Sequence, residues 1–276
     1  MTGVQTCALP IYANGSVINV GGDPRSSTQN HADVYDPAAD AWRPSIPLNG
    51  PRHHSSTVIL PDGRILVLAG WNENPGAVNP TGFAEYVDPR NNFALSRGSA
   101  YMPEIRGYHT VTVLLPDGRV LVGGGNVAGD DGRERTDFRY YYPDYMFKTR
   151  PEIVSTAQTM ITGGYSFVAV PHGTSVAEIA LVGLGSMTHS FDMNQRHVQL
   201  RMQGSPFPMR CADSADVCHD LYVVRAPAAA QAAPPGHYML FVLDANRVPS
   251  IGKILRLEPP AAGAPCFLSN CALRRH

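Results

Sequence analysis

The stretch LPDGRILVLAG at residues 60–70 decides the fold, because it returns as LPDGRVLVGGG at residues 115–125. An earlier and more divergent copy reads NGSVINVGG at residues 14–22. In each copy an Asn-Gly or Asp-Gly pair predicts a tight hairpin turn, and the alternating Val, Ile and Leu residues after it predict a strand with one buried face. The closing glycines let backbones approach each other closely. The repeat therefore predicts small antiparallel sheets that recur along the chain.

The copies recur about every 50 residues, which is the length of a kelch blade. A second shared element supports the period: VYDP at residues 34–37 returns as YVDP at residues 86–89, and YYYP follows at residues 140–143. Residues 12–148 are thus expected to form about three blades of a kelch-type β-propeller. A propeller must close into a ring of about 4–8 blades to remove its open edges. We therefore expect further blades upstream in the complete protein.

The first eleven residues, MTGVQTCALPI, fit no segment of such a fold. Back-translated with GTG as the start codon, they resemble a common sequencing-library adapter. We interpret residues 1–11 as an artefact of that kind and exclude them from the fold. On this interpretation the reading frame begins inside a gene.

The pattern changes after residue 148. Short alternating runs then follow at irregular spacing, at residues 165–170, 179–182, 197–202, 221–225, 238–243 and 253–257. Such a density of short strands in about 110 residues is typical of an Ig-like sandwich. We expect this sandwich over residues 149–259 and a tail over residues 260–276.

Composition excludes several classes of protein. The net charge is -1 without any basic run, which argues against a nucleic-acid partner. No apolar stretch approaches the roughly 20 residues that span a bilayer. The five cysteines include two close pairs, Cys211 with Cys218 and Cys266 with Cys271. Their spacing favours local disulfides of an exported protein over a zinc site, with pairs of free thiols as the alternative.

The candidate site consists of Tyr108 and His109, which precede the last hairpin, and His189 in the sequence GSMTHSFDMNQR at residues 185–196. Imidazole nitrogens and a phenolate oxygen suit copper(II). The long separation between the two segments gives no signal by itself. The alternative is that these histidines only pack, as the similar element Arg52-His53-His54 in the other blade suggests.

Several motifs together resemble the galactose oxidase and glyoxal oxidase family of copper-radical oxidases. RGYHT at residues 106–110, with the hairpin and the GGG at residues 123–125, is similar to the last blade of that family. THSFDMNQR at residues 188–196 resembles the family's copper-ligand loop. PGHYMLFV at residues 235–242 and VPS at residues 248–250 resemble its closing strands.

The resemblance implies an all-β fold: a partial kelch-type β-propeller, with about three of seven blades, followed by an Ig-like early-set β-sandwich. It also implies one copper ion, with His109 and His189 as imidazole ligands. Tyr108 would be the axial tyrosinate and the general base that takes the substrate's hydroxyl proton. The family's radical tyrosine and its cysteine partner lie in blades upstream of this chain. We therefore expect this chain alone to be inactive.

The function implied is oxidation of a primary alcohol or an aldehyde by O2, which yields hydrogen peroxide. The expected partners are O2 and a small alcohol, aldehyde or carbohydrate, with no nucleic acid and no membrane span. We expect a monomer that is secreted or held at the cell surface. The alternative is a non-catalytic kelch plus Ig-like protein that binds carbohydrates or surfaces and has lost the redox chemistry. A purely structural kelch scaffold for protein partners is a third interpretation.

Overall fold

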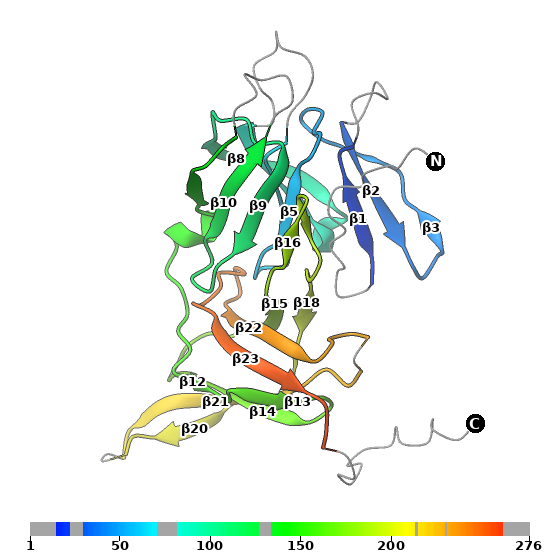
Figure 1. The fold of residues 1–276 in the computed structure, drawn as a ribbon. Coiled ribbons are helices and arrows are strands. Elements are labelled where there is room, and N and C mark those ends of the chain that lie inside the picture. The colour runs from blue at the N-terminus through cyan, green and yellow to red at the C-terminus, as the bar shows by residue number, and fades with distance from the viewer. Residues whose placement is uncertain are drawn as a thin grey trace, which may run out of the picture.

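The computed structural model describes residues 15–22, 30–70, 82–126, 134–212, 215–229 and 231–261. They form strands, turns and short 3-10 segments, which confirms the all-β class. Figure 1 shows small sheets of the N-terminal half standing above the sheets of the C-terminal half. The adapter-like segment with Cys7, and the tail from residue 262 with Cys266 and Cys271, lie outside the described residues. Within the described residues no helix is long and apolar enough to cross a membrane.

Three antiparallel sheets make up the described N-terminal half. The first sheet contains β1 (Val17–Val20), β2 (His31–Asp36), β3 (Ala41–Trp42) and β4 (Ile46–Pro47). The second contains β5 (Ser56–Ile59), β6 (Ile65–Leu68), β7 (Phe83–Asp88) and β8 (Ala94–Tyr101), and the 3-10 turn η2 (Pro89–Asn91) joins its last two strands. The third contains β9 (Tyr108–Leu114), β10 (Val120–Asn126) and β11 (Phe138–Tyr141), followed by η3 (Asp144–Phe147). The number of propeller blades and the kelch assignment stay predictions.

The two Asp-Gly hairpins form as the repeat predicts. Asp62 Oδ1 accepts the Arg64 N–H at 3.0 Å, and Asp117 Oδ1 accepts the Arg119 N–H at the same distance. Gly63 and Gly118 have φ angles of 81° and 91°, a region that a residue with a Cβ rarely enters. These turns join β5 to β6 and β9 to β10.

A buried arginine precedes the first strand of the second sheet and of the third sheet. These first strands, β5 and β9, are called the inner strands below. Arg52 donates from Nε to Glu85 Oε1 at 2.7 Å and from Nη1 to the Ala69 carbonyl at 2.8 Å. Arg106 donates from Nη1 to the Gly124 carbonyl and from Nη2 to Asp137 Oδ2, both at 2.8 Å. Each guanidinium therefore ties the start of an inner strand to the neighbouring strands of its own sheet.

Two five-stranded sheets form the C-terminal sandwich. One contains β12 (Ser155–Thr156), β14 (Tyr165–Pro171), β21 (Val217–Arg225), β19 (Arg201–Met202) and β20 (Phe207–Arg210). The other contains β13 (Thr159–Ile161), β23 (Lys253–Glu258), β22 (Gly236–Leu243), β15 (Glu178–Gly183) and β18 (His197–Gln199), in which β13 runs parallel to β23. Buried Val, Leu and Ile side chains from both sheets fill the space between them.

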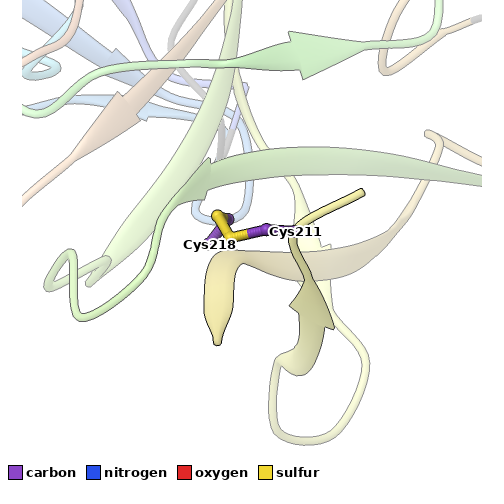
Figure 2. The surroundings of a disulfide bond; sticks show 2 residues. All are labelled: Cys211 and Cys218. Atoms are coloured by element: carbon purple, nitrogen blue, oxygen red, sulfur yellow. A yellow bond between two sulfur atoms is a disulfide. The ribbon is translucent and has the colours of Figure 1, made fainter. Parts of the chain in front are cut away.

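A disulfide joins Cys211 to Cys218, as the close spacing predicts. Figure 2 shows the bond at the turn between β20 and β21, which are hydrogen-bonded neighbours. It therefore closes a local loop of the sandwich and does not link the two halves of the chain.

One hydrophobic core continues from the N-terminal sheets into the sandwich. Leu60, Leu114 and Tyr145 on the N-terminal side belong to the same buried cluster as Met239 and Phe241 of β22. Hydrogen bonds reinforce this contact, because Arg150 donates to the carbonyls of Asp117 and Pro249. The shared core holds the sandwich at a fixed place beneath the hairpins of the N-terminal sheets.

Candidate metal centre

A two-stranded hairpin leaves the sandwich and enters the N-terminal half. It consists of β16 (Met187–Thr188) and β17 (Phe191–Asp192), with Thr188 opposite Phe191. In Figure 1 it rises beside β9 and β5, and both strands are its neighbours in space. His189 and Ser190 form the tip, with φ angles of 53° and 66°. The hairpin thus carries one predicted ligand out of its own domain.

Tyr108 and His109 are displayed by a turn at the start of β9. The Gly107 carbonyl accepts the Thr110 N–H at 3.2 Å and the Thr110 hydroxyl at 2.6 Å. His109 has a φ of 65°, as the third position of a turn with a left-handed residue requires. At this end of the strand Thr110 pairs with Gly124 and Tyr108 pairs with Asn126, so the register passes over His109.

The structure brings the three predicted ligands together. The ring centroids of Tyr108 and His109 lie 4.0 Å apart, and those of His109 and His189 lie 4.8 Å apart. Tyr108 and His189 are separated by 6.0 Å. The two imidazole planes meet at 73°, an arrangement compatible with two rings that bind one ion from different directions. Three rings from two parts of the chain therefore lie within 6.0 Å of one another.

Two further histidines extend the cluster, and the sequence analysis gave them no role in it. The His54 ring lies 4.8 Å from the Tyr108 ring, and His53 stacks on His54 at 3.8 Å. The signal that could have found them is the repeat itself. His53-His54 stands before the hairpin of the β5–β8 sheet as Tyr108-His109 stands before the hairpin of the β9–β11 sheet.

Left-handed backbone recurs in the cluster. His54 has a φ of 55°, so it shares this conformation with His109 and His189. A non-glycine residue held there costs about 1–3 kcal/mol, and such residues collect at functional sites. Three strained histidines whose rings lie in one cluster indicate that the fold maintains their positions against this cost.

Asp192 stabilises the base of the hairpin. Its Oδ1 accepts the backbone N–H groups of Ser186 at 2.8 Å and Asn194 at 3.0 Å. Burial raises the pKa of the Asp192 carboxyl, and the two backbone donors oppose that shift. These two bonds hold the ends of the loop at residues 186–194 together.

The donor set suits copper(II) better than a hard cation, because it offers imidazole nitrogens and a phenol oxygen. His189 Nδ1 lies 2.6 Å from the Thr188 hydroxyl, which leaves Nε2 as the nitrogen available to a metal. A hydrogen bond to the ring nitrogen that does not bind the metal orients a histidine ligand. Among the described residues there is no group of three or more His, Cys, Asp or Glu side chains that could hold a metal. The candidate centre depends on Tyr108 as its third donor.

Residues 150–257 match the galactose oxidase-like early set domain. This part of the chain is similar to that family. The early set domain is therefore the domain that supplies the hairpin and His189. The family resemblance predicted from the motifs is confirmed.

Longer relatives match most of the chain. Galactose oxidase from Gibberella zeae is 27% identical over 216 residues, which are 75% of this chain and 29% of that protein. The aldehyde oxidase GLOX1 from Arabidopsis thaliana is 30% identical over 226 residues, 74% of this chain and 35% of that protein. The chain thus spans about a third of the length of these relatives.

A solved structure shares the fold. A fungal alcohol oxidase of the AA5 family, in complex with copper, superimposes with a TM-score of 0.72 at 19% identity. The superposition covers 92% of this chain and 54% of that protein. The likeness extends over the N-terminal sheets as well as the early set domain, so the arrangement of the two halves is a shared feature of the fold.

Proposed function

We propose that this chain is part of a copper-radical oxidase that oxidises a primary alcohol or an aldehyde with O2. Tyr108, His109 and His189 would hold a single copper ion. The observation that carries the proposal is the convergence of these three rings from two domains, with centroid separations of 4.0–6.0 Å. The similarity to galactose oxidase and to an aldehyde oxidase supports the same class of reaction.

The proposed reaction balances in either form. A primary alcohol and O2 give an aldehyde and hydrogen peroxide, and a hydrated aldehyde and O2 give a carboxylic acid and hydrogen peroxide. When bound, copper would supply one-electron redox chemistry beside the substrate oxygen. Tyr108 Oη would accept the hydroxyl proton of the substrate as general base. We assign the hydrogen-abstracting radical to no residue of this chain, and so propose that the chain alone does not turn over.

The setting of the site agrees with these roles. His109 and His189 are exposed and Tyr108 is half-buried, so a small substrate can reach the cluster from solvent. The Cys211–Cys218 disulfide supports an exported protein, because such bonds persist in oxidising compartments. We propose secretion or a cell-surface location, and a monomer that acts on small alcohols, aldehydes or carbohydrates.

Copper titration of the chain tests the proposal directly. We expect one Cu(II) per chain, with nitrogen hyperfine structure from two imidazoles in the electron paramagnetic resonance spectrum. His189→Ala should remove one of these nitrogens. His237→Ala serves as the matched control, because that exposed histidine of β22 lies opposite Arg256 of β23. Failure of the wild-type chain to bind copper would favour the non-catalytic binding protein.

Activity needs a second experiment on the chain joined to the upstream part of its gene. A peroxide-coupled screen of primary alcohols and aldehydes should show turnover that depends on copper. Tyr108→Phe removes a proposed copper donor as well as the proposed base, so the comparison is made at saturating copper, where kcat should fall with little effect on KM. An unchanged kcat in this variant would remove the base role.

A further inference from the structure

Gln195 lies where the hairpin rejoins the sandwich, between β17 and β18, and its side chain is buried. Its amide bonds to the backbone of β5 in the other half of the chain. Oε1 accepts the Ile59 N–H at 2.8 Å, and Nε2 donates to the Thr57 carbonyl at 2.8 Å. One primary amide thus pairs with a donor and an acceptor of one strand, as a neighbouring strand would.

Within residues 183–196, the hydrogen bonds of the residues other than Gln195 stay inside the early set domain. Asp192 closes the loop by accepting two backbone N–H groups. Asn194 Nδ2 donates to the Leu184 carbonyl at 2.8 Å, and the Gly183 N–H donates to the Arg196 carbonyl at 2.9 Å. These bonds hold the hairpin together but do not attach it to β5 or β9. The bonds of Gln195 cross between the two halves.

Strands β5 and β9 connect Gln195 to the candidate metal centre. β17 lies against β5, and β5 in turn packs beside β9, the strand that carries Tyr108 and His109. The tip residues His189 and Ser190 both have left-handed backbone, and such strain persists only where surrounding contacts over-determine it. Ser190 is 1% exposed, so this residue of the tip is packed against its surroundings, whereas His189 is exposed.

We propose that Gln195 is a positioning residue for His189. By holding the hairpin to β5 it fixes the separation of the His189 and His109 rings, and so sets the copper affinity. The inference rests on the proposed function, because it needs copper at these rings. Gln195 touches neither metal nor substrate.

The first test is Gln195→Met in the 276-residue chain, since methionine keeps the length and removes both hydrogen bonds. We expect Cu(II) to bind about 10–100-fold more weakly, the range for loss of outer partners of a metal ligand. Gln195→Glu keeps the acceptor for the Ile59 N–H and loses the donor to the Thr57 carbonyl. Its affinity for Cu(II) should therefore lie between those of the wild type and Gln195→Met. Gln203→Met is the matched control, because the Gln203 amide donates within the early set domain, to the Arg201 carbonyl.

A double-mutant cycle separates positioning from general loosening of the fold. In the His189→Ala background, Gln195→Met should change copper affinity by less than about twofold, because its target ring is gone. Far-ultraviolet circular dichroism and thermal unfolding show whether each variant is folded. Wild-type copper binding with an unchanged Gln195→Met variant would overturn the inference alone, as would equal weakening in both backgrounds. A wild-type chain that takes up no copper would overturn the proposed function and this inference with it.

Discussion

The β5–β8 sheet and the β9–β11 sheet share a plan but present different chemistry. In each sheet a buried arginine precedes the inner strand, and a histidine with left-handed backbone comes two or three residues after that arginine. An Asp-Gly turn follows the strand. The left-handed residue is His54 in one sheet and His109 in the other, with φ angles of 55° and 65°. The residue before it is His53 in one and Tyr108 in the other. The two sheets therefore place a histidine at the same position and differ in the residue beside it.

The position of the hairpin tip adds a second difference. His189 lies against His109 and Tyr108, at centroid distances of 4.8 and 6.0 Å. His54 reaches the same cluster through the Tyr108 ring. The two sheets thus place similar side chains twice, and His189 of the early set domain lies against the copy that contains Tyr108 and His109. The differences between the two sheets can be tested one at a time.

The largest expected effect comes from the buried arginines. Glu85, the partner of Arg52, is 0% exposed, whereas the side chain of Asp137, the partner of Arg106, is 52% exposed. Arg52→Met leaves a buried carboxylate without its cation and should cost about 3–5 kcal/mol in the free energy of unfolding. Arg106→Met leaves a carboxylate that water can solvate, so we expect a cost of only about 1–3 kcal/mol.

Urea unfolding of both variants measures this difference. The double variant Arg52→Met with Glu85→Gln is the control, because it removes the stranded charge and should recover part of the loss. Equal costs for the two arginines would show that the burial of the partner carboxylate does not decide the energy.

The next effect separates the two left-handed histidines by copper affinity. His109→Ala removes a proposed ligand and should weaken Cu(II) binding by at least about 100-fold, more than the loss of an outer partner. His54→Ala removes a ring beside Tyr108 and should weaken binding by less than about threefold, because it leaves all three proposed donors in place. Isothermal titration with a competing chelator gives both values. A loss as large for His54 as for His109 would place His54 among the ligands.

Much of this comparison could be predicted from the sequence, because it depends on local patterns. The Asp-Gly turns, the inner strands after them and the strands of the sandwich follow from residue type and alternation. The pairing of Cys211 with Cys218 follows from their spacing. Gathering Tyr108, His109 and His189 into one candidate site relied on family resemblance, since sequence spacing carries no signal for so long a separation.

Other features depend on tertiary contacts that no local pattern contains. Residues 197–202 were expected to form one strand, but β18 pairs with β15 in one sheet and β19 pairs with β21 in the other. The chain changes sheets at Leu200, whose side chain is 3% exposed in the core between them. Gln195 was likewise missed, because a polar residue in a loop gives no sign that its amide will bond to a distant strand. Both cases required the packed structure.

The smallest expected effect distinguishes how the two hairpin turns contact the early set domain. The Pro116 carbonyl accepts the Gly252 N–H at 2.7 Å, a bond that does not titrate. The Pro61 carbonyl instead lies 3.1 Å from Nε2 of His197, whose side chain is fully buried. Burial lowers the pKa of His197, opposed by the Pro61 carbonyl. Three charged groups also act on this ring: Glu178 raises its pKa, Arg90 lowers it, and Asp62 raises it.

The sign of the pH dependence follows from that shift. The folded protein prefers neutral His197, while in the unfolded chain this histidine takes up a proton near its ordinary pKa of about 6.5. The contribution is therefore complete above pH 6.5 and is lost as the pH falls below it, by at most about 1.4 kcal/mol per pH unit. His197→Gln keeps a donor for the Pro61 carbonyl and should flatten the stability profile between pH 7 and about pH 5.5, where most carboxylates stay ionised. Parallel profiles for the wild type and this variant in thermal unfolding would mean that the β5–β6 turn is docked as independently of pH as the β9–β10 turn.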